Sequence, residues 1–526
     1  MMDLVGTKIN VADQATSIIP FHLPNYYIVG KIFNGHWHTV IREVRTMTSL
    51  LDLEPKIVWK YFDDIRKIPR CSKHEEKIRE YIVNFAKENG FDYQVDKAGN
   101  VVVRKPASTG MENKPTVVLQ AHMDMVCEKN KDVEHDFSKD PIKVKIEGEW
   151  VTADGTTLGA DDGIGVATAL AILTDENIKH PPIEALFTVD EETGLTGAFA
   201  LERDFLKGRI LINLDSEEFG VIYVGCAGGG DSTIKLPVKK TNIPSGMKIF
   251  SVFVKGLKGG HSGCDIHEQR GNAIKILARI LWKVKKDMDM RVVSITGGDK
   301  HNAIPREAEA IVAVEDEKRF REIVENEAKD ILEEIKPVDP DMKVEVKETD
   351  GKDCLDKDST EKVIDLLYAL PHGVLAMSYD IPDLVETSTN LAKVRTEDGT
   401  ITVVMSSRSS SKTELQATRD RIRAIAELAG AEVEEGSTYP GWKPNLDSKI
   451  LKLAKEVFKE MFGKEPEVKA IHAGLETGVI GEKFPGMDMI SIGPDVKNPH
   501  TPDERVHIGS VEKFYKYVAK ILERVE

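Results

Sequence analysis

The chain has 526 residues, of which 41% are hydrophobic and 30% are charged, and its formal net charge at pH 7 is −16. This length corresponds to two large domains or three to four average ones, and it buries enough apolar surface to fold without disulfides or structural metals. The negative charge opposes binding to nucleic acid, no apolar run approaches the ~18 residues of a membrane-spanning helix, and five scattered cysteines suit a reducing cytoplasm. We therefore expect a cytoplasmic protein that binds neither nucleic acid nor membrane.

Residues 1–46 differ in composition from the rest of the chain. They hold 7 charged residues, Asp3 occupies the place of a basic signal-peptide n-region, and no clear helical or strand periodicity is present. Two interpretations stay open. Either the functional chain begins near Met47, which makes the leader a mis-called start or a dispensable extension, or residues 1–46 form a genuine N-terminal arm.

From Glu54 to about Gly230, amphipathic helices alternate with short apolar runs. The expected elements are a helix that begins near Glu54, helices His74–Asn89 and Ile164–Leu173, and strands Val117–Gln120, Glu184–Val189 and Ile210–Leu214. Nearly continuous apolar strands spaced by helices are typical of a sheet buried on both faces. The pattern predicts an α/β domain with a mostly parallel central sheet.

Between about Asp231 and Ser437 the strands alternate polar and apolar residues, which indicates a different layer structure. Expected strands are Phe250–Val254, Ala308–Val314, Lys343–Val346 and Ile401–Met405, and expected helices are Asn272–Lys286, Arg319–Ile335, Thr360–Ala369 and Glu414–Leu428. The order suggests two related α+β halves over an antiparallel sheet.

After Trp442 the earlier pattern returns, with helix Lys449–Phe462, strand Met487–Ile492 and helix Val511–Val525. The sequence therefore predicts one α/β domain, residues 47–230 and 438–526, interrupted by an inserted α+β domain, residues 231–437.

Histidines and carboxylates follow the ends of the predicted α/β strands. They are His122 and Asp124, then Asp190, Glu191 and Glu192, then Asp215, and after a loop His500; Asp161 and Asp162 precede the helix Ile164–Leu173. Because open α/β sheets place ligand sites at the carboxyl ends of their strands, we expect these groups to converge.

Convergent carboxylates repel one another, and a divalent cation removes that repulsion. Imidazole with carboxylate suits zinc, and also cobalt or manganese. Five ligands exceed the three usual for one catalytic zinc, which points to two metals that share a carboxylate. Asp124 is placed to orient His122. Glu191 and Glu192 are neighbours on an extended segment and point opposite ways, so one can bind metal while the other holds a proton.

Each motif also has an ordinary structural interpretation that involves no metal. A single His-x-Asp is commonly a solvated loop, Asp-Glu-Glu is commonly a charged turn, and Gly-Ala-Asp-Asp-Gly can be a capped helix start. The shared location of the three motifs at successive strand ends favours the metal site.

Together the motifs resemble the two-zinc aminoacylase/carboxypeptidase family of metallopeptidases. Three further segments, residues 259–267, 300–306 and 472–476, are similar to the cytosolic non-specific dipeptidases of that family, also called aminoacyl-histidine dipeptidases. The similarity runs from about Met47 to the C-terminus, and members of the family normally begin near the equivalent of Met47. It implies a zinc-peptidase-like catalytic domain, an inserted lid and association domain, and a homodimer formed through that insertion.

The resemblance also implies a role for each clustered residue. His122 and Asp215 would hold one metal, Glu192 and His500 the other, and Asp161 would bridge the two. Glu191 would be the general base, and Asp124 would orient His122. Sequence spacing alone does not choose between Asp161 and Asp162, or between Glu191 and Glu192.

Four more residues resemble substrate contacts of the family. His261 would stabilise the tetrahedral oxyanion, within a subunit or across a dimer. Arg408, helped by Asn302, would hold the substrate carboxylate, and Glu476 would hold the free amine. Three of them also have a structural interpretation without substrate. His261 can lie in a turn, Arg408 can form a surface ion pair, and Glu476 can be a capping or buried ion-pair carboxylate. The remaining histidines in question are expected to be structural or to contact the site residues without binding metal: His267, His301, His372 and His472.

The leading functional hypothesis is metal-dependent hydrolysis of unblocked dipeptides with broad specificity, including Xaa-His dipeptides. A rival on the same fold is an N-acyl-amino-acid amidohydrolase, which needs no free amine. A third hypothesis is a non-catalytic metal- or peptide-binding protein, which the presence of Glu191 beside Glu192 disfavours.

Overall fold

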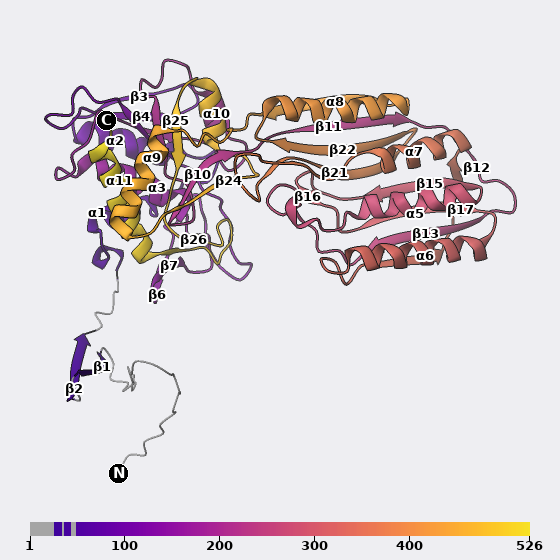
Figure 1. Cartoon of the computed structure of the whole chain (residues 1–526), viewed down its shortest axis with the longest axis horizontal. Helices are drawn as coiled ribbons and strands as arrows, with labels where there is room; N and C mark the ends of the chain where they lie inside the picture. The colour runs from indigo at the N-terminus through magenta and orange to yellow at the C-terminus, as the bar shows by residue number, and fades with distance from the viewer. Residues whose placement is uncertain (1–25, 34–35, 44–48) are drawn as a thin grey trace, which may run out of the picture.

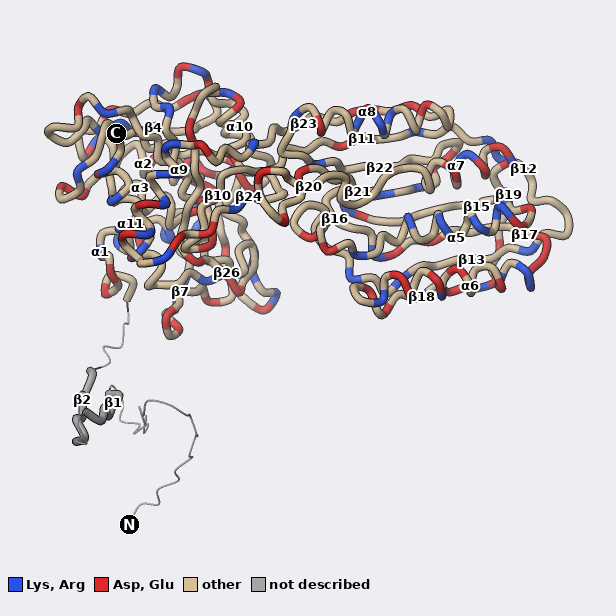
Figure 2. The backbone as a smooth tube through the Cα atoms, in the orientation of Figure 1, with Lys and Arg blue, Asp and Glu red and all other residues tan. Residues whose placement is uncertain are grey.

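The computed structural model describes residues 26–33, 36–43 and 49–526 (Figure 1). Two lobes lie next to each other along the long axis of the molecule, and each is built on one large sheet. The first lobe contains the C-terminus, and the second is formed by the middle of the chain. Basic and acidic residues are interspersed along both lobes (Figure 2).

The first lobe has an eight-stranded sheet in the order β24-β10-β25-β9-β5-β8-β4-β3. Its strands are β3 (Asp92–Val95), β4 (Val101–Lys105), β5 (Val117–His122), β8 (Ile183–Thr188), β9 (Ile210–Asn213), β10 (Val221–Cys226), β24 (Glu467–Ile471) and β25 (Asp488–Ser491). The central pairs β8–β5, β5–β9 and β9–β25 are parallel, as is β10–β24. The mostly parallel sheet predicted from the apolar runs is confirmed.

Helices cover both faces of this sheet because alternate strand residues point to opposite sides. In β5, Val117 and Leu119 belong to the core beneath one set of helices, whereas Val118 belongs to the core beneath the other. The first set is α1 (Lys56–Ile65), α2 (Glu76–Glu88), α3 (Ala160–Thr174), α9 (Lys449–Phe462) and α11 (Ile508–Arg524), and the second is α4 (Thr196–Ala200) and α10 (Glu476–Lys483). Every residue of β5 and β8 is buried.

A small four-stranded sheet, β26-β27-β7-β6, lies beside the main sheet of the first lobe. It consists of β6 (Val144–Glu147), β7 (Trp150–Ala153), β26 (Val496–Lys497) and β27 (Arg505–His507). Pairing of β27 with β7 brings the segment that contains His500 towards the loop that precedes α3.

The second lobe has a nine-stranded antiparallel sheet in the order β18-β13-β17-β15-β21-β22-β11-β23, with β20 also paired to β21. The strands are β11 (Gly228–Pro237), β13 (Lys248–Lys255), β15 (Met290–Gly297), β17 (Ala308–Val314), β18 (Lys343–Glu348), β20 (Gly373–Met377), β21 (Val385–Glu397), β22 (Thr400–Ser409) and β23 (Glu432–Tyr439). The helices are α5 (Ala273–Asp287), α6 (Glu317–Ile335), α7 (Lys357–Ala369) and α8 (Lys412–Leu428). Short elements complete the lobe: β12 (Lys240–Asn242), β14 (Gly260–His261), β16 (Ala303–Ile304), β19 (Asp353–Leu355) and the 3₁₀ turn Ile266–Glu268.

The two halves expected in this lobe are present, and they share one strand order. One half is β13-α5-β15-β17-α6-β18, and the other is β11-α7-β21-β22-α8-β23. When the four strands of each half are numbered along the chain, both halves have the order 4-1-3-2 across the sheet. They meet through β15 and β21, the second strand of each. The halves are not consecutive, because β11 precedes the whole of the other half.

The chain passes between the lobes twice, at residues 226–228 and 439–442 (Figure 1). The two passages are hydrogen-bonded to each other, because Cys226 N–H donates to Trp442 O and Trp442 N–H donates to Cys226 O, both at 2.9 Å. The predicted boundaries at 230/231 and 437/438 fall inside β11 and β23, close to these passages. The division into domains stays a prediction from the sequence.

Two expectations about the chain differ from the structure. Two antiparallel strands, β1 (Tyr26–Phe33) and β2 (His36–Glu43), pair with each other where no strand periodicity was expected. Backbone groups alone form such a ladder, so it needs no apolar alternation. Met47 lies outside the described residues.

Cys71 and Cys127 form a disulfide, although the cysteine spacing predicted none, because the fold brings their Cα atoms to 5.7 Å. Within the described residues, no helix has the length and apolarity that a membrane span needs.

Candidate metal centre

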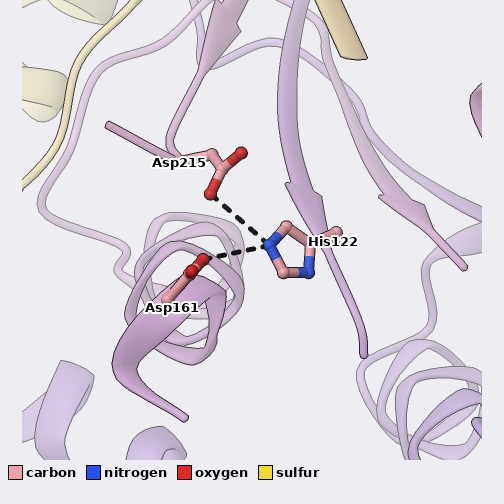
Figure 3. Close-up of side chains that lie close together, drawn as sticks. All are labelled: His122, Asp161 and Asp215. Atoms are coloured by element: carbon pink, nitrogen blue, oxygen red, sulfur yellow. Dashed lines mark hydrogen bonds and ion pairs between the residues drawn. The ribbon is translucent and has the colours of Figure 1, made fainter. Parts of the chain in front are cut away.

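Side chains from three separate segments meet at the carboxyl ends of β5 and β9. His122 is the last residue of β5, and its Nε2 atom lies 3.1 Å from Asp161 Oδ1 and 3.5 Å from Asp215 Oδ1 (Figure 3). Asp215 follows β9, and Asp161 lies at the start of α3. The convergence predicted from the strand ends is therefore present for these three residues.

A second group shares Asp161 with the first. The other carboxylate oxygen of Asp161, Oδ2, lies 3.0 Å from His500 Nε2, and the same nitrogen lies 3.0 Å from Glu192 Oε2. The two oxygens of one carboxylate thus contact two different histidines. Ligand atoms of each group lie within 4.8 Å of one another.

The adjacent carboxylates Asp161 and Asp162 have different contacts. Asp162 Oδ2 accepts a hydrogen bond from the backbone N–H of His122 at 3.2 Å, and its Oδ1 accepts from Gly165 N–H at 3.1 Å. Asp162 therefore supports the end of β5 and the first turn of α3, while Asp161 faces the histidines.

Glu191 and Glu192 follow β8, and both have a carboxylate oxygen near the ring of His122. Glu192 pairs with His500, as described above. Glu191 forms no ion pair with a histidine in the described part of the chain. Burial raises the pKa of Glu191 well above its ordinary value, and the negative charges of Asp215 and Glu476 raise it further. A half-buried carboxyl group beside the cluster thus binds its proton more tightly than an ordinary glutamate does.

Asp124 lies behind the cluster and is fully buried. Its Oδ1 atom lies 3.3 Å from His122 Nδ1, and its two oxygens accept the backbone N–H groups of Glu191 and Glu192 at 3.1 and 3.2 Å. Burial alone would raise the pKa of Asp124, but the contacts with His122 and Ser72 lower it to about 2. Asp124 is therefore an anion that fixes both the imidazole and the Glu191–Glu192 turn.

The electrostatics of the cluster favour a cation among these side chains. Hydrogen bonds to Asp161 and Glu192 raise the pKa of His500 to about 11. Burial, with the charges of Asp161 and Glu192, raises the pKa of Asp215 to about 6. Glu192 Oε1 is buried and has no hydrogen-bond partner in the described residues. Imidazole nitrogens and carboxylate oxygens are the ligands that divalent transition metals prefer, so the residues present fit such an ion.

A cleft of about 640 Å³ runs from Glu192 to the second lobe. Its walls include Asn302 from the second lobe, Tyr439 from the passage between the lobes, and Gly474 from the first lobe. The cleft is large enough for a small molecule that contacts both lobes at once.

Arg408 and His261 lie together next to this cleft. Arg408 is 7% exposed, its Nη1 donates to Tyr439 Oη at 2.8 Å, and its Nη2 lies 3.4 Å from His261 Nε2. Burial and the charge of Arg408 lower the pKa of His261. Among the described residues, His261 makes no hydrogen bond or ion pair with the five clustered side chains. The structure thus groups His261 with Arg408 and not with the five clustered side chains.

Glu476 begins α10 and is 1% exposed. Its Oε2 accepts hydrogen bonds from Gln120 Nε2 at 2.6 Å and Thr188 Oγ1 at 2.7 Å, while its Oε1 has no partner among the described residues. Burial raises the pKa of Glu476 to about 7.

Three of the four histidines that were not expected to bind metal contact residues outside the cluster. His301 Nδ1 pairs with Asp231, His472 Nε2 lies 2.7 Å from Ser388 Oγ, and His372 Nδ1 lies 3.2 Å from Asn272 Nδ2.

Several residues around the cluster belong to no sequence motif. Ser72 donates to Asp124 Oδ2 at 2.8 Å, and Arg70 donates to the backbone oxygens of Met123 and Asp124 at 3.0 and 2.6 Å. Glu217, two residues after Asp215, has its pKa raised to about 8 by burial and by neighbouring carboxylates. A lone Arg, Ser or Glu outside a motif is indistinguishable in sequence from a surface residue.

Comparison with known proteins identifies the family. The model of the peptidase family M20/M25/M40 matches residues 118–524. The chain belongs to this family. The resemblance inferred from the motifs is thereby confirmed, and with it the expected catalytic fold.

Two similar proteins span nearly the whole chain. The cytosol non-specific dipeptidase of Escherichia coli K12 is 43% identical over 488 residues, which are 91% of this chain and 99% of the relative. The crystal structure of aminoacylhistidine dipeptidase from Vibrio alginolyticus is 44% identical, covers 91% of this chain and 99% of its own, and superposes with a TM-score of 0.87. An aminopeptidase from Bacillus cereus shares the fold, with a TM-score of 0.52 at 18% identity, 90% of this chain and 99% of its own being covered.

Proposed function

We propose that this M20-family enzyme is a metal-dependent dipeptidase that hydrolyses unblocked dipeptides with broad specificity, including Xaa-His dipeptides. The observation that carries the proposal is the Asp161 carboxylate, whose two oxygens contact two histidines, with the half-buried Glu191 beside them. Full-length similarity to two proteins named as dipeptidases supports the same reaction class.

Two divalent metal ions would be held by five side chains. His122 and Asp215 would hold one ion, Glu192 and His500 the other, and Asp161 would bridge them. Zinc is the proposed metal, with cobalt and manganese as alternatives that the same ligands accept. When bound, such ions polarise the scissile carbonyl and lower the pKa of water towards neutrality.

Glu191 would act as the general base. It would take a proton from the attacking water and pass it to the leaving amine, which needs a carboxyl group able to exist in both protonation states near neutral pH. The raised pKa of Glu191 supports this role. Asp124 would orient His122 and, through the two backbone N–H groups that it accepts, the turn that carries the base.

The substrate would lie in the cleft between Glu192 and Asn302. We propose that Arg408 and Asn302 hold its carboxylate, since a guanidinium can bind a carboxylate through two parallel hydrogen bonds. Arg408 Nε is buried without a partner among the described residues, which leaves a donor for this purpose. His261, next to Arg408, would stabilise the oxyanion. Glu476 Oε1, also unpartnered, would receive the substrate ammonium group.

We also propose a cytoplasmic homodimer formed through the second lobe. The Escherichia coli relative is named a cytosol enzyme, which supports the location. The separation of His261 from the metal cluster supports a role for movement of the second lobe, or for a partner's second lobe, in delivering that imidazole.

The test is hydrolysis of a dipeptide panel and of the same dipeptides carrying an N-acetyl group. We expect cleavage of the free dipeptides, loss of activity after exhaustive chelation, and recovery on adding zinc, cobalt or manganese. Cleavage of the acetylated forms alone would favour the amidohydrolase alternative. Unchanged activity after complete removal of metal would refute the mechanism.

A further inference from the structure

The carboxylate of Glu504 is wrapped by the loop that presents Asp161. Its Oε2 accepts the backbone N–H groups of Leu158 and Gly159 at 2.7 and 2.9 Å, and its Oε1 accepts those of Ala160 and Asp161 at 2.7 and 3.2 Å. The residue is 2% exposed. One side chain thus binds four consecutive amides, the last of which belongs to Asp161 itself.

These four N–H groups lie where α3 begins, and the first N–H groups of a helix have no partner within the helix. Without Glu504 they would be buried donors with no acceptor, which is costly, and the loop would rearrange to satisfy them. The backbone position of Asp161 therefore depends on this carboxylate. The geometry of that loop is not helical, because Asp161 has φ −80° and ψ 116°.

Two hydrogen bonds fix the backbone of Glu504. Its backbone oxygen accepts from Thr152 Oγ1 at 2.8 Å, and its backbone N–H donates to Thr501 O at 3.0 Å. It stands four residues after His500, in the segment between β26 and β27. The side chain thus connects the segment that carries His500 to the loop that carries Asp161.

Arg70 contacts the same loop through one of its backbone oxygens. It is 2% exposed and donates to the backbone oxygen of Gly159, the residue whose N–H Glu504 accepts. A buried cation near the buried carboxylate reduces the cost of removing both from water.

We propose that Glu504 is a positioning residue that sets the separation of Asp161 and His500, and thereby the affinity of the site for its pair of metal ions. The proposal rests on the proposed function only in that these two residues bind metal. Glu504 contacts neither substrate nor metal in this role, because both of its oxygens are occupied by backbone N–H groups.

The test compares Glu504→Gln with Glu184→Gln. Glu184 is a matched control: it is also 2% exposed, its Oε2 accepts the N–H groups of Lys207 and Gly208 at 2.8 and 2.9 Å, and its Oε1 lies 3.1 Å from Arg104 Nε. It sits near the start of β8, whereas Glu191 and Glu192 follow the end of that strand. Both substitutions put an amide NH₂ where a buried carboxylate oxygen faced hydrogen-bond donors.

Metal-free protein is titrated with Co²⁺ and followed by visible absorption, with thermal unfolding measured in parallel. We expect E504Q to lose about tenfold or more in affinity for at least one Co²⁺ and to change the absorption spectrum. We expect E184Q to keep the wild-type titration even where its melting temperature falls. A folded E504Q with the wild-type titration and spectrum would overturn the proposal.

Glu504→Asp, which keeps the charge but shortens the side chain, is the second variant if E504Q does not fold; the same weakened titration is expected. Unfolding of both variants in saturating Co²⁺ would also overturn the proposal, because the residue would then support the whole fold and not the metal spacing. Binding of two Co²⁺ by wild-type protein without dipeptide hydrolysis would contradict the proposed function alone.

Discussion

Asp124 Oδ1 accepts a hydrogen bond from the backbone N–H of Glu191 at 3.1 Å. The carboxylate that contacts His122 therefore also holds in place the turn that carries Glu191, the proposed general base. In Asp124→Asn, an amide NH₂ replaces one accepting oxygen and faces a backbone donor. We expect kcat for dipeptides to fall about 10- to 100-fold, with a smaller loss for Ser72→Ala, which removes one hydrogen bond to the same carboxylate. Activity of D124N within twofold of wild type would contradict this account.

Glu191→Gln and Glu192→Gln form a matched pair on one turn. We expect Glu191→Gln to lower kcat by about 10²- to 10⁴-fold, because the proton acceptor is lost, while the protein still binds two metal ions per subunit. Glu192→Gln removes the carboxylate that contacts His500 and should lose one ion. Elemental analysis with steady-state kinetics separates the two outcomes. Metal loss in Glu191→Gln with none in Glu192→Gln would reverse the two roles.

Arg408→Ala tests recognition of the substrate carboxylate. Loss of a buried charge-assisted contact should raise KM for dipeptides about 10- to 100-fold. Dipeptide amides, which lack the carboxylate, should be nearly unaffected, so the preference for free dipeptides over amides should collapse. Tyr439→Phe is the control, because it removes only the hydroxyl that Arg408 contacts at 2.8 Å. An equal loss on both classes of substrate would point to a structural role for Arg408.

Glu476→Gln should change how the stability of the metal-free protein depends on pH. Burial raises the pKa of Glu476 from 4.5 to about 7 in the folded state. The folded protein therefore binds this proton more tightly than the unfolded chain, and stability is lost as pH rises through that window. Each pKa unit corresponds to about 1.4 kcal/mol. E476Q does not titrate there, so its free energy of unfolding relative to wild type should rise by about 2 to 3 kcal/mol between pH 5 and pH 8. Urea unfolding at the two pH values measures this change. The same difference in free energy of unfolding between E476Q and wild type at both pH values would contradict the raised pKa of Glu476.

Thiol titration tests the bond between Cys71 and Cys127. The structure leaves Cys226, Cys264 and Cys354 as thiols, of which Cys264 is exposed. Purified without reductant, the denatured protein should react at three thiols, and at five after reduction. In the native protein Cys264 should react first, because it is exposed while Cys226 and Cys354 are buried. Burial raises the pKa of all three thiols, that of Cys226 to about 11, and only the thiolate is reactive. Five reactive thiols before reduction would show that the bond does not form.

Much of the site could be predicted because it follows from strand ends. His122 and Asp215 occupy the carboxyl ends of β5 and β9, and parallel pairing of those strands makes their convergence a consequence of topology. Spacing could not choose between Asp161 and Asp162, and only the family resemblance favoured Asp161, because the choice depends on the backbone dihedral angles of a loop. The sequence gives both residues the same chemistry, and only the fold gives them different partners.

The features that were missed depend on contacts that leave no pattern in the chain. Glu504 binds backbone N–H groups, which are the same whatever side chains the loop carries. The Cys71–Cys127 bond spans 56 residues without a recognisable spacing motif. In the second lobe the repeated strand order was foreseen only in outline, since β11 is separated along the chain from the rest of its half.

The mutual hydrogen bonds of Cys226 and Trp442 have a consequence for chain entropy. The free-energy cost of an insertion depends on how far apart its two ends must be held, and only weakly on the length of chain between them. Here the ends are neighbours in a β-bridge. The first sheet therefore accommodates an entire second lobe at about the entropic cost of a short connection, and the lobe could be exchanged or resized without reorganising the strands that carry His122 and Asp215.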